Sequence, residues 1–290
     1  MTMVGDESTV TEPSIVDGVK PVLRWAGGKR WLVPRLEPLL AQADFARYFE
    51  PFVGGGAVFF GAIAGVPSLL SDANEDLIRT YQSIKDDPDE VFAHYSVLEN
   101  EATRYYEVRS REPFDAAESA ARFLYLNHHS YNGIYRVNLS GKYNVPFGSR
   151  AAPNMPTLAH LREASARLAS AQLTAGGYQS QVAAAGAGDL LFVDPPYVTA
   201  ESSQGFTKYT KDKFDFENQR ELAELTLGAA RRGAQIILTN AAHPSISALF
   251  RPLGYMYRLS RRNSIGGRKA TRGSADEYLF TNIRVKGGIS

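Results

Sequence analysis

The sequence of 290 residues contains no cysteine. Disulfides and thiolate zinc sites are therefore excluded, and so is any mechanism that needs a thiolate nucleophile. No apolar run reaches the roughly 18 residues that span a bilayer, and the N-terminus lacks the basic start and apolar stretch of a signal peptide. We therefore expect a cytoplasmic protein without a membrane partner.

Charge is nearly balanced over the whole chain, which carries 32 basic and 31 acidic residues. The segment from Arg258 to Arg272 departs from this balance, because it holds six basic residues and no acidic one. Its serines and glycines predict a mobile loop between the last two strands that contacts nucleic-acid phosphates. A solvated run of charges is the alternative reading.

Short apolar runs alternate with helical patterns through most of the chain. We expect strands at 48–53, 68–72, 189–193, 235–238 and 278–285, and helices at 29–40, 57–64 and 74–84. This alternation is typical of an α/β fold whose parallel sheet is covered by helices on both faces. Residues 1–20 are expected to form a flexible leader.

The alternation is interrupted between residues 86 and 157. Residues 86–126 are helix-rich and polar, whereas residues 127–157 are rich in Asn, Gly and Pro and predict a hairpin. The expected core side chains of this segment are Phe92, Tyr95, Leu98, Tyr105, Phe123 and Leu124. We therefore expect one α/β domain formed by residues 21–85 and 158–290, with residues 86–157 inserted into it.

A glycine turn, Gly54-Gly55-Gly56, follows the first expected strand. Glycines at this point let the backbone approach a nucleotide-like ligand at the carboxyl edge of an open sheet. Asp72 ends the second strand, 18 residues after Gly54, close to the spacing of an acid that accepts hydrogen bonds from ribose hydroxyls. A tight strand-to-helix turn and a helix N-cap are the structural alternatives for these two features.

The strongest chemical signal is Asp194-Pro195-Pro196-Tyr197 at the end of an apolar strand. Two prolines stiffen the backbone and offer carbonyl acceptors without amide donors. The exocyclic amine of a base has two N–H donors, so Asp194 and a proline carbonyl can each accept one of them. Tyr197 can then stack on the base, and Asp194, Pro195, Pro196 and Tyr197 are predicted to be catalytic.

These motifs, together with Trp25-Ala26-Gly27-Gly28-Lys29, resemble the Dam-like D12 class of adenine-N6 DNA methyltransferases. The order of glycine turn, inserted region and Asp-Pro-Pro-Tyr is that of the alpha class, and the resemblance runs from Pro21 to Val285. It implies a Rossmann-like, S-adenosylmethionine-dependent methyltransferase sheet with an inserted helical and hairpin DNA-recognition domain. It also implies site-specific methyl transfer to an adenine that is flipped out of duplex DNA.

Matching the family's motifs residue by residue gives two sets of binding positions. The cofactor set is Trp25, Lys29, Phe52, Gly54, Gly56, Asp72, Tyr178 and Asp194. The DNA set is Arg24, Asn127, Tyr131, Asn132, Ile134, Arg136, Asn138 and Pro146. The resemblance implies that Asp72 holds the ribose, that Lys29 lies near the cofactor carboxylate and that Arg136 reads a base. The likeness of the hairpin makes GATC the first candidate target.

Two positions depart from the family pattern. Gly177 precedes Tyr178 where members often carry an acid near the adenine of the cofactor, and Ser149 separates Gly148 from the basic Arg150. The neighbouring His128 and His129 are expected to be structural or to face DNA. No spacing of possible ligands predicts a metal site.

Several alternative functions stay open from the residues alone. Cytosine N4 is the same kind of amine, although Asp194 rather than serine at the start of the motif favours adenine. RNA or a protein side-chain amide is another possible acceptor, and the last alternative is a non-catalytic DNA-binding homologue. The lack of cysteine excludes the covalent adduct of cytosine C5 methylation. The resemblance implies a bacterial, archaeal or phage protein that acts on double-stranded DNA; a cognate restriction endonuclease as a second partner stays open.

Overall fold

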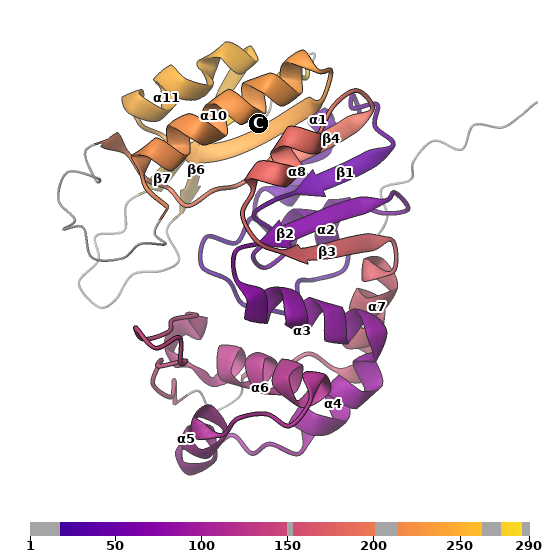
Figure 1. The fold of residues 1–290 in the computed structure, drawn as a ribbon, viewed down its shortest axis with the longest axis vertical. Helices are drawn as coiled ribbons and strands as arrows, with labels where there is room; N and C mark the ends of the chain where they lie inside the picture. The colour runs from indigo at the N-terminus through magenta and orange to yellow at the C-terminus, as the bar shows by residue number, and fades with distance from the viewer. Residues whose placement is uncertain (1–17, 150–152, 201–213, 263–273, 286–290) are drawn as a thin grey trace, which may run out of the picture.

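The computed structural model describes residues 18–149, 153–200, 214–262 and 274–285. Its centre is a seven-stranded sheet in the order β3-β2-β1-β4-β5-β7-β6 (Figure 1). The strands are β1 Arg47–Glu50, β2 Ser68–Asp72, β3 Ala171–Ala175, β4 Asp189–Val193, β5 Gln235–Ala241, β6 Tyr255–Arg262 and β7 Ser274–Thr281. The first five strands in spatial order pair in parallel, whereas β7 pairs antiparallel with both β5 and β6. The predicted α/β fold is confirmed, but the sheet is mixed rather than parallel throughout.

Helices cover both faces of this sheet (Figure 1). They are α1 Val33–Leu40, α2 Ala57–Ala62, α3 Glu75–Asp86, α7 Leu158–Leu168, α8 Gln179–Ala184, α10 Phe216–Arg231 and α11 Pro244–Phe250, with the short η2 at Arg251–Leu253. No helix among the described residues is long and apolar enough to cross a membrane.

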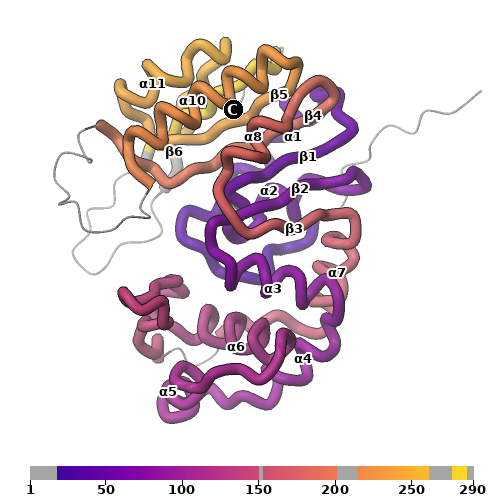
Figure 2. Tube along the Cα trace, in the orientation of Figure 1, coloured from indigo at the N-terminus to yellow at the C-terminus, as the bar shows by residue number. Residues whose placement is uncertain are grey.

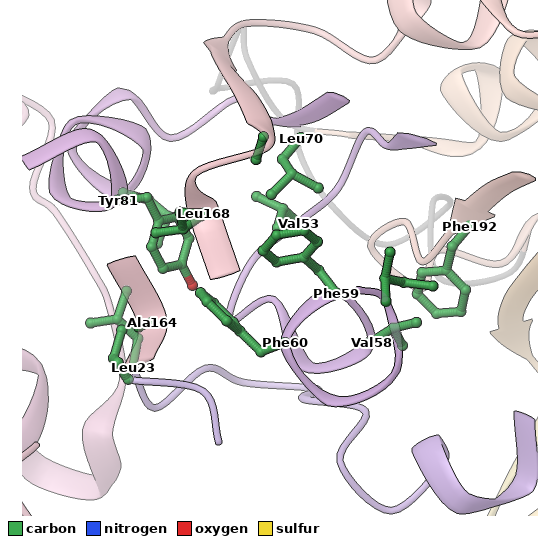
Figure 3. Close-up of a cluster of buried hydrophobic side chains, with 14 of the residues drawn as sticks. Leu23, Val53, Val58, Phe59, Phe60, Leu70, Tyr81, Ala164, Leu168 and Phe192 are labelled. Carbon is green, nitrogen blue, oxygen red and sulfur yellow. The ribbon is translucent and has the colours of Figure 1, made fainter. Parts of the chain in front are cut away.

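Each face of the sheet has its own apolar core, because successive residues of a strand point to opposite sides. Leu190 and Phe192 of β4 face the core that α1, α2, α3 and α7 complete. Leu191 and Val193 face the core that α8, α10 and α11 complete. Figure 3 shows part of the first core, with Val53, Leu70 and Phe192 among its side chains. All of β4 is buried, as expected of a central parallel strand.

The parallel strands bring the predicted motifs to one edge of the sheet. The carboxyl ends of β1, β2, β4 and β5 lie on the same side because these strands pair in parallel. The glycine turn follows β1, Asp72 ends β2 and Asp194 follows β4. This edge is where open α/β sheets bind their ligands.

The segment 86–157 forms the lower part of the molecule in Figure 2, below α3. Its helices are α4 Pro88–Ser96, α5 Ala102–Ser110 and α6 Ala116–His129, followed by the 3₁₀ turn η1 Tyr131–Gly133. The helix α3 ends at Asp86 and α7 begins at Leu158, on either side of this segment. Of its predicted core side chains, Tyr95, Tyr105, Phe123 and Leu124 are buried, and Phe92 and Leu98 are partly buried. Several of them join the first core of the sheet, so the segment packs continuously onto the rest of the protein.

The predicted hairpin after α6 has little regular strand structure in its described part. Two isolated antiparallel bridges hold it, between Ser130 and Phe147 and between Val137 and Tyr143. At its start Asn132 has a φ of 57°, a left-handed conformation that is uncommon for a residue with a side chain.

Several predictions of helices and strands were wrong. The first strand ends at Glu50 rather than Val53. The first helix begins at Val33 rather than Lys29, with a proline in its first turn, so Lys29 lies in the preceding turn. The edge strand β3 was missed, because only its first residue is buried. The last strand is Ser274–Thr281 rather than 278–285. Residues 258–262, predicted to lie in a basic loop, belong to β6, and the guanidinium of Arg258 forms an ion pair with the carboxylate of Asp276 on β7. The other basic residues of that predicted loop, Arg268, Lys269 and Arg272, lie outside the described residues.

Candidate active site

A pocket of about 1210 Å³ opens at the carboxyl edge of the sheet. Its walls are the 25–29 turn, the glycine turn after β1, Asp72, the 176–179 segment and the 194–198 segment. The predicted cofactor and catalytic residues are therefore brought together, although they come from five separate parts of the chain. The hairpin residues of the predicted DNA set do not line this pocket.

The glycine turn needs its glycines for both conformation and space. Gly54 and Gly56 have φ values of 46° and 62°, in the left-handed region that side chains disfavour. A Cβ on Gly54 would lie 2.7 Å from Cδ1 of Trp25, so the indole packs directly on the turn. Trp25 and the turn together form a continuous wall of the pocket.

Asp72 orders this turn with both of its oxygens. Oδ2 accepts the Gly54 amide at 3.0 Å and Oδ1 accepts the Asn74 amide at 2.9 Å. Burial is the main reason that the pKa of Asp72 is raised, and these two amides counteract it. The N-cap of α3 is Asn74 rather than Asp72. A carboxylate oxygen has more than one lone pair, so Asp72 can still accept a ligand hydroxyl.

Three aromatic rings form another wall of the pocket. Phe52 stacks on Tyr178 with ring centroids 5.1 Å apart, and Phe214 meets both rings edge-on or tilted. The Tyr178 hydroxyl donates to Oε2 of Glu221 at 2.6 Å, and this hydrogen bond fixes the ring. The glycine at position 177, where family members often carry an acid, therefore does not leave the ring unheld. This wall offers an apolar contact for a flat heterocycle.

One oxygen of Asp194 lies within hydrogen-bond distance of three donor groups. Its Oδ1 lies 2.9 Å from Nζ of Lys29, 2.7 Å from Oγ1 of Thr239 and 3.2 Å from the hydroxyl of Tyr197. Oδ2 of Asp194 accepts no hydrogen bond from the described residues. The carboxylate is therefore held firmly through one oxygen and keeps the other for a ligand.

The two proline carbonyls beside Asp194 differ in the same way as its two oxygens: one accepts a hydrogen bond from the described residues and the other does not. The carbonyl of Pro196 accepts Nε2 of Gln219 at 2.8 Å, and Gln219 is held in turn by Asn240 at 3.0 Å. The carbonyl of Pro195 takes no hydrogen bond from the described residues. Oδ2 of Asp194 and the Pro195 carbonyl are thus the two acceptors that an amine could use.

Lys29 lies between two carboxylates. Its Nζ is 2.9 Å from Asp194 and 3.5 Å from Oε2 of Glu277, and it also donates to the Gly27 carbonyl at 3.0 Å. The side chain of Lys29 is 5% exposed, so this charge depends on its partners. The same Nζ lies 4.8 Å from the ring centroid of Tyr197, a cation–π contact.

Tyr197 keeps its phenolic proton in this setting. Its hydroxyl donates to Oε2 of Glu277 at 2.8 Å. The pKa of Tyr197 is raised well above 10, first by burial of the hydroxyl end and then by the charges of Asp194 and Glu277. The residue as a whole is 37% exposed and lines the pocket, which leaves it accessible to a stacking partner.

Glu50 is a further acid in the pocket wall that the sequence-based prediction did not include. It is buried, with its Oε2 2.8 Å from the hydroxyl of Tyr48. Burial raises its pKa to about 8; the Tyr48 hydrogen bond opposes this shift and the charge of Asp194 adds to it. The position of Glu50 at the end of the first strand, four residues before Gly54, was a signal that could have identified it.

Thr239, Gln219 and Glu277 were missed because no local pattern marks them. They lie on β5, α10 and β7. The pairing of β5 with β4 and with β7 brings Thr239 and Glu277 to the site, and Gln219 reaches the Pro196 carbonyl from α10. Among the described residues no group of three or more His, Asp or Glu side chains could hold a metal ion.

The predicted DNA set divides into exposed and buried residues. Tyr131, Asn132, Ile134, Arg136, Asn138 and Pro146 are exposed on the hairpin. Arg136 donates from Nε to Oδ1 of Asn144 at 2.7 Å, which orients its guanidinium. Asn138 instead accepts the Lys142 amide at 2.9 Å and closes the hairpin tip.

The prediction that Asn127 contacts DNA is wrong in this structure. Asn127 is 2% exposed, and its amide forms two 2.8 Å hydrogen bonds to the backbone of Arg24. The Arg24 guanidinium lies under Gly133 and donates to the Asn132 carbonyl at 3.4 Å, while Trp25 stacks on Tyr135. Asn127 therefore joins the pocket wall to the hairpin.

The two histidines after Asn127 are structural. His128 Nε2 lies 2.9 Å from the Val22 carbonyl, and His129 Nδ1 lies 2.8 Å from the Tyr125 carbonyl. Burial is the main cause of the lowered pKa of both rings, which favours their neutral forms. Both are almost fully buried, so neither is available to DNA.

The mixed seven-stranded sheet with a pocket at its carboxyl edge is consistent with a methyltransferase fold. Residues 25–263 match the model of the D12 class N6 adenine-specific DNA methyltransferase family, and the chain belongs to this family.

Relatives from bacteria and phage support the same assignment. The DNA N-6-adenine-methyltransferase of Escherichia phage P1 is 35% identical over 274 residues; the match covers 90% of this chain but only 35% of the phage protein. The DNA adenine methylase of Escherichia coli (strain K12) is 32% identical, with 89% of this chain and 93% of that protein covered. The type II methyltransferase M1.LlaDCHI of Lactococcus lactis subsp. cremoris is 29% identical over 91% of this chain and 95% of that protein.

Proposed function

We propose that this protein transfers a methyl group from S-adenosylmethionine to N6 of an adenine that is flipped out of duplex DNA. The observation that carries the proposal is that the two oxygens of the Asp194 carboxylate have different surroundings. Lys29 and Thr239 hold Oδ1, with the Tyr197 hydroxyl 3.2 Å away, whereas Oδ2 and the Pro195 carbonyl are left as a pair of acceptors. An exocyclic amine has two N–H donors and can satisfy both acceptors at once.

This pair of acceptors would activate the amine. The nitrogen lone pair of adenine N6 is delocalised into the ring, and hydrogen bonds from both of its protons favour a more tetrahedral, nucleophilic nitrogen. S-adenosylmethionine supplies an electrophilic methyl carbon. As N6 forms its new bond to the methyl carbon, the bond between that carbon and the sulfonium sulfur would break, and S-adenosylhomocysteine would be the leaving group. N6 would then be cationic and would lose one proton, for which the carboxylate oxygen Oδ2 of Asp194 is the more basic of the two acceptors. Tyr197 would stack on the base, and its high pKa keeps it a neutral phenol.

The rest of the pocket fits the methyl donor. The glycine turn leaves space that a Cβ would fill, and Asp72 retains lone pairs for ribose hydroxyls. Trp25, Phe52, Gly54, Gly56 and Tyr178 would enclose its flat and apolar parts. Lys29 contacts Asp194 and Glu277, which supports an orienting role rather than the predicted contact with the cofactor carboxylate.

We further propose that the 86–157 segment recognises DNA through its hairpin. Four large apolar side chains are exposed within nine residues there, namely Tyr131, Ile134, Val137 and Leu139. Such an exposed set favours an interface. Tyr131 and Asn132 would enter the space left by the flipped base, and Arg24 and Arg136 would contact bases at opposite ends of the site. Asn138 and Pro146 would support the same surface.

The target sequence GATC can be tested with short duplexes. Methyl incorporation is measured on a GATC duplex and on duplexes that each change one base of the site. We expect the GATC duplex to be preferred, and Arg136→Ala to relax the preference at one base pair by about 1–3 kcal/mol. Equal incorporation into all duplexes would reject GATC. A uniform loss with Arg136→Ala would make it a phosphate contact instead.

The other functions considered have weaker support. Cytosine N4 offers the same donors to Asp194, but the family membership favours adenine. A non-catalytic DNA-binding role does not explain the arrangement of hydrogen-bonding groups around Asp194. The type II name of the Lactococcus relative makes a cognate restriction endonuclease a possible partner, and the phage relative is compatible with a solitary enzyme.

A further inference from the structure

Glu277 lies in the same hydrogen-bonded group as Asp194, although it belongs to none of the motifs. It is 5% exposed on β7, the antiparallel strand beside β5. Its Oε2 lies 2.8 Å from the Tyr197 hydroxyl and 3.5 Å from Nζ of Lys29. An acid this deeply buried needs a compensating role, because desolvation of a carboxylate is costly.

From this geometry we infer that Glu277 is a positioning residue that fixes the Tyr197 ring against the flipped adenine. The inference rests on the proposed function. In it, the Pro195-Pro196 pair restricts the backbone end of Tyr197, and Glu277 holds the hydroxyl end. A ring held at both ends presents one face in a constant orientation.

The hydroxyl of Tyr197 has two possible acceptors but only one proton to give. The contact to Glu277 is 2.8 Å, whereas the contact to Asp194 is 3.2 Å. The shorter contact lies at the usual distance of an O–H···O hydrogen bond and takes the proton. Asp194 then relies on Lys29 and Thr239, and the tyrosine is oriented by Glu277.

Glu277 also balances the charge of Lys29. The ammonium lies 2.9 Å from Asp194 and 3.5 Å from Glu277, so it is shared between two carboxylates. The register of the sheet explains this placement: Glu277 pairs with Ala241, two residues beyond Thr239 on the same strand. Residues two apart on a strand share a face, so Thr239 and Glu277 reach the site from the same side.

A double-mutant cycle tests the inference. Glu277→Ala, Tyr197→Phe and the double variant are compared with wild type by single-turnover methylation of duplex DNA. We expect Glu277→Ala to slow transfer about tenfold, and to have an effect several-fold smaller when Tyr197 is already Phe. Glu277→Gln keeps an acceptor for the phenol and should recover most of the rate. The same factor in both backgrounds would overturn the inference.

A second readout separates positioning from a merely structural role. With 2-aminopurine at the target adenine, stacking on Tyr197 quenches the emission of the flipped base. Glu277→Ala should raise this emission while the dissociation constant for DNA changes less than about twofold. Unchanged emission in Glu277→Ala would contradict the inference.

Tyr197→Phe keeps the test decisive should Glu277→Ala fail to fold. It removes only the hydroxyl, so it should lower the rate and raise the emission, whereas a hydroxyl without a positioning role predicts no change in either. Wild-type methylation is measured first. Its absence would refute the proposed function, whereas an active wild type with an additive cycle would refute only the inference about Glu277.

Discussion

Nζ of Lys29 lies 2.9 Å from Oδ1 of Asp194, which joins a turn near the start of the chain to the end of the central strand β4. The lysine side chain is 5% exposed and the aspartate side chain is 19% exposed, so this ion pair is largely withdrawn from water. Removing one partner of such a pair leaves the other charge buried without compensation. Loss of either partner is therefore expected to destabilise the fold and to disturb the orientation of Asp194.

We predict that Lys29→Met lowers the free energy of unfolding by about 3 kcal/mol, because Asp194 and Glu277 lose their shared cation. Urea unfolding measures the change. Arg79→Ala is the matched control, since Arg79 pairs with Glu75 on the exposed face of α3. Such an exposed pair contributes no more than about 0.5 kcal/mol. Equal changes in the two variants would show that the Lys29 pair behaves as a surface pair.

Glu50 predicts a specific dependence of stability on pH. Its pKa is about 8 in the folded protein and close to 4.5 when unfolded, so unfolding releases a proton between these values. The contribution of Glu50 to stability is therefore fully present below about pH 4.5 and is lost as the pH rises toward 8. Glu50→Gln should remove this part of the decline and match wild type only at the acidic end. Parallel stability curves for the two proteins from pH 5 to pH 8 would contradict the assignment.

The glycine turn predicts a sharp contrast between two Gly→Ala substitutions. Gly54→Ala should lower stability by more than about 1 kcal/mol and weaken S-adenosylmethionine binding, because the φ is 46° and a Cβ would collide with Trp25. Gly186→Ala is the control, since its nearest neighbours lie 3.7 Å from the added Cβ and its φ is not positive. Calorimetric titration and thermal unfolding check both variants. A Gly54→Ala protein that binds the cofactor like wild type would refute the proposed cradle.

Asn127 predicts a stability effect where the family resemblance suggested DNA contact. Asn127→Ala removes two buried hydrogen bonds to Arg24 and should lower the free energy of unfolding by about 2 kcal/mol. The salt dependence of DNA binding should stay the same, because no phosphate contact is lost. A variant with wild-type stability and weakened DNA binding would restore the original prediction.

Features encoded locally were predictable from the sequence. The run Leu190–Val193 is apolar throughout and ends at Asp194 and two prolines, which defines both a buried strand and its end. The glycine turn and Asp72 carried a spacing that their hydrogen bond now explains. The apolar positions of 86–126 likewise predicted most of its buried side chains.

Features that depend on distant pairing were not predictable in this way. Thr239 reaches Asp194 because β5 pairs with β4, and Glu277 reaches the site because β7 runs antiparallel beside β5; no single segment records these arrangements. The strand β6 reads as a basic loop because it lies at the edge of the sheet, where charged residues such as Arg258 are tolerated. Asn127 matched a DNA-contact position, but its burial follows from how α6 packs against the 22–25 segment.

The most direct test of the account is the identity of the methylated nucleoside. The purified protein and its Asp194→Ala variant are each incubated with labelled S-adenosylmethionine and unmethylated DNA, which is then digested and separated by chromatography with mass detection. We predict label in N6-methyldeoxyadenosine for the wild type, and a rate at least about a hundredfold lower for Asp194→Ala. Label in N4-methyldeoxycytidine, no label in DNA, or undiminished transfer by Asp194→Ala would contradict it.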